Sequence, residues 1–207
     1  MKLQILVAVM LIALFSSLAG GTTLESFAPV QDAPKTKDVE LTLEMALKVT
    51  FKVPETAARP QIDAGGSVID VNRVAAITIP TLPPKAAVQE RFGGKEPTPE
   101  DLVKAFKDWT WALDGAERKN VPEKPTIITP QKGPKIVMLE YDVVHERNGT
   151  SRQAALMIYF EERVIFIVCT LIPDKLADRL LLTEERKALN FGKMVYDITS
   201  SLKISKL

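Results

Sequence analysis

The chain has 207 residues, with 27 Lys and Arg against 26 Asp and Glu, so its formal net charge is only +1. No basic run is longer than two residues, which argues against the clustered positive surface that nucleic acids and anionic membranes require. The single cysteine, Cys169, excludes an internal disulfide framework, so a hydrophobic core must supply the stability.

The N-terminus has the three parts of a secretion signal. Lys2 supplies a positive charge, an apolar run spans residues 3–15, and the small residues Ser17 and Ala19 fit the −3 and −1 positions of signal peptidase. The sequence therefore predicts a signal peptide of residues 1–19, cleaved after Ala19, and a secreted or periplasmic protein. An uncleaved anchor is the alternative. The apolar run is shorter than the roughly 18 to 20 residues that span a bilayer, so we expect no stable membrane insertion after cleavage.

The mature chain is expected to begin with a flexible leader of residues 20–38, followed by one domain of residues 39–204. Apolar and polar residues alternate strictly from Val39 to Val53, which predicts a single half-buried strand. A loop of residues 54–66 then leads to a β-rich stretch, residues 68–79, which we expect to pair with that strand. Proline-containing loops are expected at residues 80–97.

A helix is predicted from Pro99 to Arg118. Thr98 is a suitable N-cap, and proline and acidic residues follow it in the first turn. One apolar stripe repeats at helical spacing and comprises Leu102, Phe106, Trp109 and Leu113.

A three-strand meander is predicted after a linker of residues 119–134. Asn148-Gly149 indicates a two-residue hairpin turn, which would place Tyr141 opposite Leu156 and Leu139 opposite Ile158. A second turn at residues 161–162 would place Leu156 opposite Ile167. Both turns put apolar residues on one common face, and the strand of residues 164–171 is apolar on both faces, as expected of a central, covered strand.

The chain is expected to end in a helix capped by Thr183. Its buried stripe would comprise Phe191, Val195, Ile198 and Leu202. Two amphipathic helices packed on an antiparallel sheet predict an α+β fold, an α/β/α sandwich.

No catalytic residue, metal ligand or cofactor site can be assigned from the sequence. In the predicted register Cys169 and His145, the only histidine, lie two strands apart, too far for a nucleophilic dyad. We expect Cys169 to be a buried structural thiol and His145 a solvated residue beside the turn. One histidine and one cysteine cannot build the usual zinc sites, and no calcium-loop spacing occurs, so we expect no metal or cofactor.

Two speculative sites lie on the second face of the predicted meander. Glu140 and Asp142 would share that face with Met138, Met157 and Phe166. Carboxylates on an apolar face can have raised pKa values and act as acid and base, although a position at the wet end of the face is the simpler interpretation. The three apolar residues could instead line a cavity for an apolar ligand.

Trp111 is a third speculative binding residue, because it lies about 180° from the apolar stripe of its predicted helix. Either it is exposed to a partner or the proline-containing loops cover it, and we favour the second interpretation.

Asn148-Gly149-Thr150 also matches an N-glycosylation sequon, although the turn alone explains the Asn-Gly pair.

The order of elements resembles the PsbP/DcrB-like α/β/α domains over about residues 39–204. The resemblance depends on Phe51-Lys52-Val53-Pro54, the helix of residues 102–113, the Tyr141/Asn148-Gly149/Tyr159 meander, and the closing segment of residues 198–204. The chain departs from the family in its long alternating strand before Pro54 and in lacking a lipid-attachment cysteine. The resemblance implies an extracytoplasmic accessory protein with a protein partner, and no functional residue carries over.

Three functions therefore remain open. The preferred hypothesis is a non-catalytic extracytoplasmic binding module that assists a larger protein complex. The alternatives are a small hydrolase or lyase using Glu140 and Asp142, and a carrier of an apolar ligand near Met138, Met157 and Phe166.

Overall fold

The computed structural model describes residues 35–207 except for residue 45, residues 112–114 and residues 131–132. The chain divides into two units, residues 1–35 and residues 36–207, and the fold described below is that of the second. The predicted signal peptide and residues 20–34 of the predicted leader lie outside the described residues. Regular structure begins at Thr36, three residues before the expected start of the domain.

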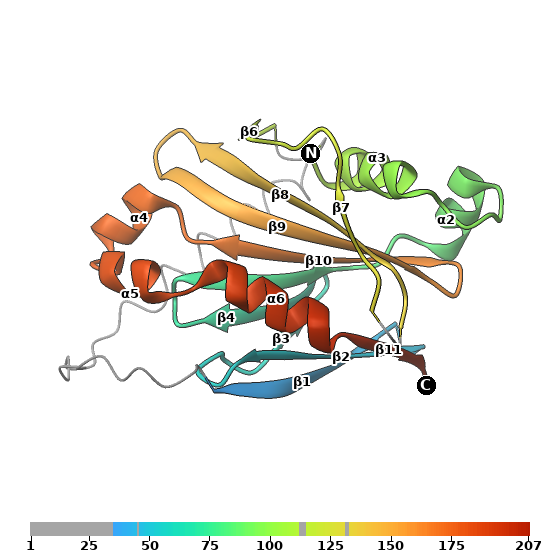
Figure 1. Ribbon diagram of the computed structural model, residues 1–207, viewed down its shortest axis with the longest axis horizontal. Helices are drawn as coiled ribbons and strands as arrows, with labels where there is room; N and C mark the ends of the chain where they lie inside the picture. Colours follow the sequence, from blue (N-terminus) through green and yellow to red (C-terminus); the bar gives the residue numbers. More distant parts are fainter. Residues whose placement is uncertain (1–34, 45, 112–114, 131–132) are drawn as a thin grey trace. The chain divides into compact units, whose positions relative to one another are not determined.

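An antiparallel sheet of eight described strands forms the centre of this unit (Figure 1). Its strands are β3 (Gln61–Asp63), β4 (Gly66–Val71), β5 (Ala75–Pro80), β6 (Glu117–Lys119), β7 (Thr126–Ile128), β8 (Ile136–His145), β9 (Gly149–Phe160) and β10 (Arg163–Leu171). The order is β3-β4-β5-β10-β9-β8-β6, and β7 also pairs with β8. The expected three-strand meander is present as β8, β9 and β10, and β10 lies in the interior of the sheet as its two apolar faces indicated.

A smaller sheet has the order β1-β2-β11 and consists of β1 (Thr36–Leu43), β2 (Leu47–Pro54) and β11 (Lys203–Lys206). The prediction of one long strand from Val39 to Val53 is wrong, because the chain reverses after Leu43, and Glu44 adopts a φ of 49°. Leu43 lies opposite Leu47, so an odd number of residues separates the two strands and the alternation stays in phase across the turn.

The predicted pairing of residues 68–79 with this first β segment is also wrong. β4 and β5 pair with each other as a hairpin, and β5 pairs with β10. An isolated bridge joins Ala57, in the loop after β2, to Val71 at the end of β4. Apolar residues on both β4 and β5 face the core, so burial of the hairpin in the larger sheet satisfies the pattern equally well.

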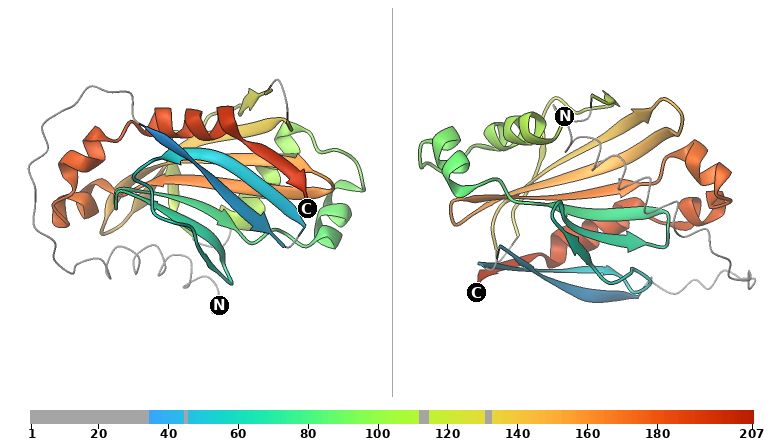
Figure 2. Two further views of the ribbon diagram at one scale, coloured as in Figure 1. Left: turned by 90° about the horizontal axis from the view of Figure 1, so that it is seen from below. Right: turned by 180° about the vertical axis from the view of Figure 1, so that it is seen from behind.

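Helices cover both faces of the larger sheet. They are α2 (Lys85–Phe92), α3 (Pro99–Thr110), α4 (Asp174–Arg179), α5 (Thr183–Ala188) and α6 (Phe191–Ser201). Figures 1 and 2 show α2 and α3 over one face, and α6 with the smaller sheet over the other. This arrangement confirms the predicted α+β class, an antiparallel sheet with helices packed on it.

Each face of the larger sheet has its own hydrophobic core. The core on the α6 side includes Phe51, Ile77, Leu156, Ile167 and Ile198. The core on the α3 side includes Phe106, Leu139, Tyr141, Met157 and Phe166. The two cores meet only through the backbone of the sheet, because alternate residues of each strand belong to opposite faces.

Helix α3 begins as predicted and ends early. The Thr98 hydroxyl accepts a hydrogen bond from the Asp101 N–H at 3.2 Å, and the Asp101 carboxylate accepts one from the Thr98 N–H at 3.1 Å. This capping box fixes the first turn. The helix ends at Thr110 rather than at Arg118, which instead lies in β6 opposite Val143. Residues 117–119 therefore form the strand β6, paired with β8, in place of the predicted end of the helix.

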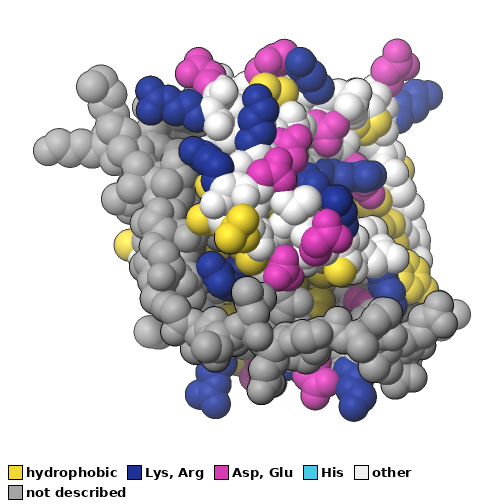
Figure 3. Space-filling view, turned by 90° about the vertical axis from the view of Figure 1, so that its left-hand side faces the viewer, with side chains coloured by type: hydrophobic (Ala, Val, Ile, Leu, Met, Phe, Trp, Pro, Cys, Tyr) yellow, Lys and Arg dark blue, Asp and Glu magenta, His cyan; other side chains and the backbone are white. Residues whose placement is uncertain are grey.

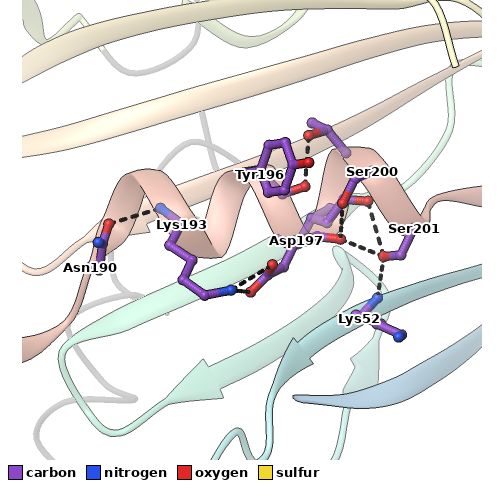
Figure 4. Close-up of polar contacts among 9 residues, drawn as sticks. Lys52, Asn190, Lys193, Tyr196, Asp197, Ser200 and Ser201 are labelled. Atoms are coloured by element: carbon purple, nitrogen blue, oxygen red, sulfur yellow. Dashed lines mark hydrogen bonds and ion pairs between the residues drawn. The ribbon is translucent and has the colours of Figure 1, made fainter. Parts of the chain in front are cut away.

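Two segments contain helices that the sequence did not predict. Helix α2 lies within residues 80–97, which were predicted to be proline-containing loops, and has one buried residue, Val88. Thr183 begins the short helix α5 rather than α6. Asn190 caps α6 by accepting a hydrogen bond from the Lys193 N–H at 2.9 Å (Figure 4). The predicted stripe of α6 is buried, as expected.

Helix α6 is fastened to the smaller sheet at its C-terminal end. The backbone N–H of Lys52 on β2 donates to the Ser201 hydroxyl at 2.7 Å (Figure 4). The chain then continues directly into β11, where Ile204 lies opposite Val49. On the outer side of α6, Lys193 and Asp197 form an ion pair at 2.8 Å.

The register of the β8–β9 hairpin differs from the prediction by three residues. Leu139 lies opposite Ala155 and Tyr141 opposite Gln153, because the connection consists of residues 146–148 rather than residues 148–149. The Asn148 N–H donates to the His145 carbonyl at 3.2 Å, and Gly149 then begins the return strand with a φ of 84°. A shift by an odd number exchanges the faces, so Leu139 does not share a face with Leu156 and Ile167. The β9–β10 register, with Leu156 opposite Ile167, is confirmed.

Among the described residues, no helix combines the length and the apolarity that crossing a membrane would require.

Candidate binding surface

The corrected register separates the residues of the two speculative sites. Glu140 lies opposite Ala154 and Met138 opposite Leu156, so both point to the α6 side of the sheet. Met157 and Phe166 belong to the core on the α3 side. The expectation that Glu140 and Asp142 share a face with Met157 and Phe166 is therefore wrong, and Met138 lies on the opposite face from the other two apolar residues.

Each of the two carboxylates already has a partner. Glu140 pairs with Arg152 at 2.7 Å, and Asp142 accepts a hydrogen bond from the side-chain amide of Asn120 at 2.6 Å. Glu140 lies opposite the buried Ala154, whereas Asp142 lies opposite the charged Arg152. The arrangement is that of solvated, paired charges near the end of a sheet.

Trp111 packs against Tyr141 of β8, in the core on the α3 side of the sheet. Its indole N–H donates to the Tyr141 hydroxyl at 3.2 Å, and that hydroxyl donates to Gln153 at 2.9 Å. The Lys107 and Arg118 cations lie 5.1 and 4.8 Å from the ring centre. Trp111 is the C-cap of α3 and keeps a helical backbone conformation, with a φ of −73° and a ψ of −35°, and its N–H donates to the Lys107 carbonyl.

Cys169 is a buried structural thiol, as predicted. It is fully buried in the core on the α6 side, and burial raises the pKa of its thiol to about 12. His145 lies beside the hairpin turn, as expected, but is half-buried and hydrogen-bonded through Nε2 to the Ser151 hydroxyl at 3.0 Å. The His145 and Cys169 side chains form no dyad, because they lie on opposite sides of the sheet. Ser151, the partner of His145, lies opposite Val143 on the α3 side, whereas Cys169 belongs to the core on the α6 side.

Two further kinds of site can be assessed in the described part of the chain. No group of three or more histidine, cysteine, aspartate and glutamate residues lies close enough to hold a metal ion there. A small open hollow of about 90 Å³ lies between the loop before α3 and the start of β8. It is lined by Glu96, Pro97, Pro99, Leu102, Pro134, Lys135, Val137 and Tyr159. None of the predicted binding residues contributes to it.

The feature most typical of a binding site lies at the junction of α4 and α5. Leu181 is 87% exposed, more than any other large apolar residue that the structure describes. It also has a φ of 56°, the left-handed conformation that a leucine rarely adopts. We call residues 174–188, which comprise α4, α5 and this junction, the α4–α5 shoulder.

Leu181 occupies the position that glycine usually holds at the end of a helix. The Leu182 N–H donates to the Ala177 carbonyl at 2.8 Å, and the Leu181 N–H donates to the Asp178 carbonyl at 3.2 Å. This is the Schellman pattern of helix termination, in which the residue after the C-cap is left-handed. The buried Leu182 and Ala177 supply the apolar contact that accompanies the motif, so the backbone holds Leu181 outward.

The shoulder is clamped to the tip of the β8–β9 hairpin. The Asp174 carboxylate accepts the Thr150 N–H at 2.9 Å, and the Leu176 N–H donates to the Asn148 carbonyl at 3.2 Å. Burial alone would raise the pKa of Asp174, but the hydrogen bonds from the backbone N–H groups of Thr150 and Lys175, together with nearby cations, hold it below its usual value. The Arg179 guanidinium also donates to the Asn148 side chain. Leu181 is therefore displayed from a rigid base.

Apolar side chains on this side of the molecule lie among charges of both signs (Figure 3). The exposed charged residues of the shoulder include Asp178, Arg179, Glu184, Glu185 and Lys187. An apolar centre inside a polar rim is the usual anatomy of a protein-binding surface. Sequence reasoning missed this surface, although the run Leu180-Leu181-Leu182 before Thr183 was a usable signal.

Comparisons with known proteins show the fold. No model of a known protein family matches the sequence, and no curated protein matches it significantly. The Ran-binding protein Mog1p of Saccharomyces cerevisiae has a similar structure, with a TM-score of 0.51 and 12% identity, over 83% of this chain and 96% of that chain. The two proteins share a fold.

Cyanobacterial PsbP (CyanoP) from Synechocystis sp. PCC 6803 is also similar, with a TM-score of 0.47 and 16% identity, over 89% of this chain and 99% of that chain. The resemblance to PsbP-like domains inferred from the sequence is thus confirmed as a weak likeness of fold. At these identities neither comparison transfers a functional residue.

Proposed function

We propose that this chain is a non-catalytic accessory module that works outside the cytoplasm, assists a larger protein complex, and contacts its protein partner through the α4–α5 shoulder. The observation that carries the proposal is Leu181, a leucine 87% exposed in a left-handed backbone conformation. Backbone strain that brings no packing within the fold is a recognised mark of a functional position.

The energetics favour a role for this side chain in binding. A left-handed leucine costs about 1 kcal/mol relative to glycine, and exposing it to water adds no stability in return. Burying a leucine side chain in a partner's pocket contributes about 1.5–3 kcal/mol. Binding therefore offsets the conformational free energy that the left-handed Leu181 costs, whereas folding alone does not.

Two further observations support a binding role. The similar protein Mog1p is described as Ran-binding, so this fold can serve as a protein-binding module. The hydrolase or lyase hypothesis lacks comparable support, because Glu140 and Asp142 are paired with neighbouring side chains. The carrier hypothesis likewise lacks support, because Met138 and Met157 lie on opposite faces of the sheet.

The location outside the cytoplasm is supported by the sequence of residues 1–19. Cell fractionation, with the mass of the mature N-terminus, tests this part separately. A protein that begins at Gly20 and is found in the envelope or medium is the expected result. A cytoplasmic protein that retains residues 1–19 would contradict the location without bearing on the shoulder.

The binding surface is tested by crosslinking and then by affinity. A photoreactive amino acid at position 181 of the tagged full-length protein should crosslink to one partner in intact cells. The same group at Leu207, another exposed leucine at 66%, is the matched control. The partner identified in this way is then purified, and its Kd is measured against wild-type protein and Leu181→Gly.

Leu181→Gly separates binding from folding. Glycine relieves the left-handed strain, so the variant should be about 1 kcal/mol more stable by urea denaturation. Its Kd for the partner should rise roughly tenfold to a hundredfold, since the apolar contact is lost. A variant that is more stable and binds the crosslinked partner with unchanged affinity would refute the role of Leu181.

A further inference from the structure

Asn148 differs in its chemical surroundings from the other asparagines of the chain. The chain has four, and Asn72, Asn120 and Asn190 precede the larger residues Arg73, Val121 and Phe191. Asn148 precedes Gly149, which carries no side chain to shield its own backbone nitrogen. That nitrogen is the atom that can attack the preceding side-chain amide, so steric access favours position 148.

The structure adds a positive charge at this amide. The guanidinium of Arg179, an exposed residue at the end of α4, donates a hydrogen bond to Oδ1 of the half-buried Asn148. A cationic donor on the amide oxygen withdraws electron density from Cγ. It also stabilises the negative charge that develops on that oxygen when a nucleophile adds to Cγ.

We propose that Asn148 is a site of spontaneous deamidation and isomerisation, assisted by Arg179. The Gly149 nitrogen loses its proton to water or hydroxide and attacks Cγ of Asn148, and the Cγ–Nδ2 bond breaks. Nδ2 takes up a proton from water and leaves as ammonia, which gives a five-membered succinimide. Water then adds to one of the two ring carbonyls, and the ring opens to aspartate or to isoaspartate.

The two products affect the α4–α5 shoulder differently. Aspartate at position 148 keeps the backbone unchanged and faces Arg179 with a full negative charge. Isoaspartate routes the main chain through the side-chain carbon and displaces the carbonyl that accepts the Leu176 N–H. It also shifts Gly149, where an added Cβ would lie 1.8 Å from Asp174 Oδ1, so there is no spare room at the clamp. Isomerisation therefore loosens the base of the shoulder.

The test is mass spectrometry of the purified full chain after prolonged incubation at mildly alkaline pH and physiological temperature. Peptide mapping measures deamidation at each asparagine, and isoaspartate is identified by its fragmentation. Arg179→Met removes the donor but keeps an apolar stem of similar length. Arg147→Met is the matched control, an exposed arginine at the same hairpin tip. Each protein is also incubated fully unfolded in urea.

We expect folded wild-type protein to react at Asn148 well before Asn72, Asn120 and Asn190. Arg179→Met should slow the folded-state reaction by roughly threefold to tenfold, less than the hundredfold or more that buried oxyanion donors supply in enzymes. Arg147→Met should leave the rate unchanged, and the three proteins should react alike in urea. An unreactive Asn148 in the folded protein, or an Arg179→Met rate equal to or above that of wild type, would overturn the proposal. Neither result bears on partner binding.

Discussion

Gly149 is held at the hairpin tip by two separate constraints. Its φ of 84° lies in the left-handed region, and a Cβ there would meet the Asp174 carboxylate, which is itself fixed by the Thr150 N–H. Gly94 also has a positive φ, 73°, but its Cβ would meet nothing within 4 Å. A comparison of substitutions at the two glycines therefore separates the effect of backbone strain on stability from the effect of close contact.

We expect Gly149→Ala to cost more stability than Gly94→Ala. The strain of a left-handed alanine is about 1 kcal/mol at both positions. At Gly149 the Asp174 carboxylate must also move, and the loss of its hydrogen bonds adds about 1–3 kcal/mol. Urea denaturation of the two variants measures the difference, and equal losses would show that the clamp contributes nothing.

Cys169 should be chemically silent in the folded protein. Its side chain is fully buried, and burial raises the pKa of the thiol to about 12. Almost no thiolate therefore forms near neutral pH. We expect a thiol reagent at pH 8 to label the protein only as fast as it unfolds. Addition of urea should raise the labelling rate in step with the unfolded fraction, whereas rapid labelling in buffer alone would show that the core opens locally at β10.

Single residues were predictable where the surrounding strand is apolar on both faces. Cys169 follows the unbroken apolar run from Val164 to Val168, so burial was the consistent interpretation. The surroundings of Trp111 were not predictable, because they depend on tertiary contacts with Tyr141 and Arg118. The left-handed conformation of Leu181 was not predictable either, since it follows from helix-terminating hydrogen bonds that leucine does not signal. Only the apolar run of residues 180–182 was visible in the sequence.

At the level of single elements, the cap of α3 should contribute measurable stability. Thr98→Ala removes the hydroxyl that accepts the Asp101 N–H, and loss of such an N-cap costs about 1 kcal/mol at neutral pH. Urea denaturation monitored by circular dichroism measures this loss. In an Asp101→Asn background the same substitution should cost less, because the reciprocal hydrogen bond is already weakened.

The contribution of this cap depends on pH with a definite sign. Hydrogen bonds from the side chain and then the backbone of Thr98 lower the pKa of Asp101. Because the folded-state pKa lies below the unfolded one, the ionised carboxylate stabilises the protein above the usual aspartate range. That stability is lost as the pH falls through the folded value. The difference between wild type and Thr98→Ala should thus shrink in strong acid, and a constant difference from pH 7 to acid would contradict it.

The existence of elements was easier to predict than their registers. A three-residue turn at residues 44–46 joins strands whose buried positions are all odd-numbered, so the pattern is the same as that of one long strand. At Asn148-Gly149 the glycine supplies its positive φ after the turn and not within it. Composition cannot distinguish these two uses of glycine. The resulting three-residue shift in register moved Leu139 and Tyr141 to the opposite face from the one predicted.

On the scale of the whole molecule, the larger sheet is a partition between two cores that share strands. Phe51 lies on the α6 side and is fully buried, and Phe106 lies on the α3 side and is 1% exposed. Both tryptophans, Trp109 and Trp111, pack on the α3 side. Because alternate residues of β8, β9 and β10 serve the two cores, neither core can lose its packing while the sheet remains intact.

This sharing predicts a single cooperative unfolding transition. Phe51→Ala and Phe106→Ala should each lower the free energy of unfolding by about 3–5 kcal/mol. Tryptophan fluorescence reports only the α3 side, whereas circular dichroism reports the whole sheet. For Phe51→Ala, whose cavity lies on the far side of the sheet from both indoles, the two signals should still shift together to the same lower urea midpoint. If the fluorescence midpoint stayed at the wild-type value while the circular dichroism midpoint fell, the two faces would unfold independently, and the sheet would not couple them.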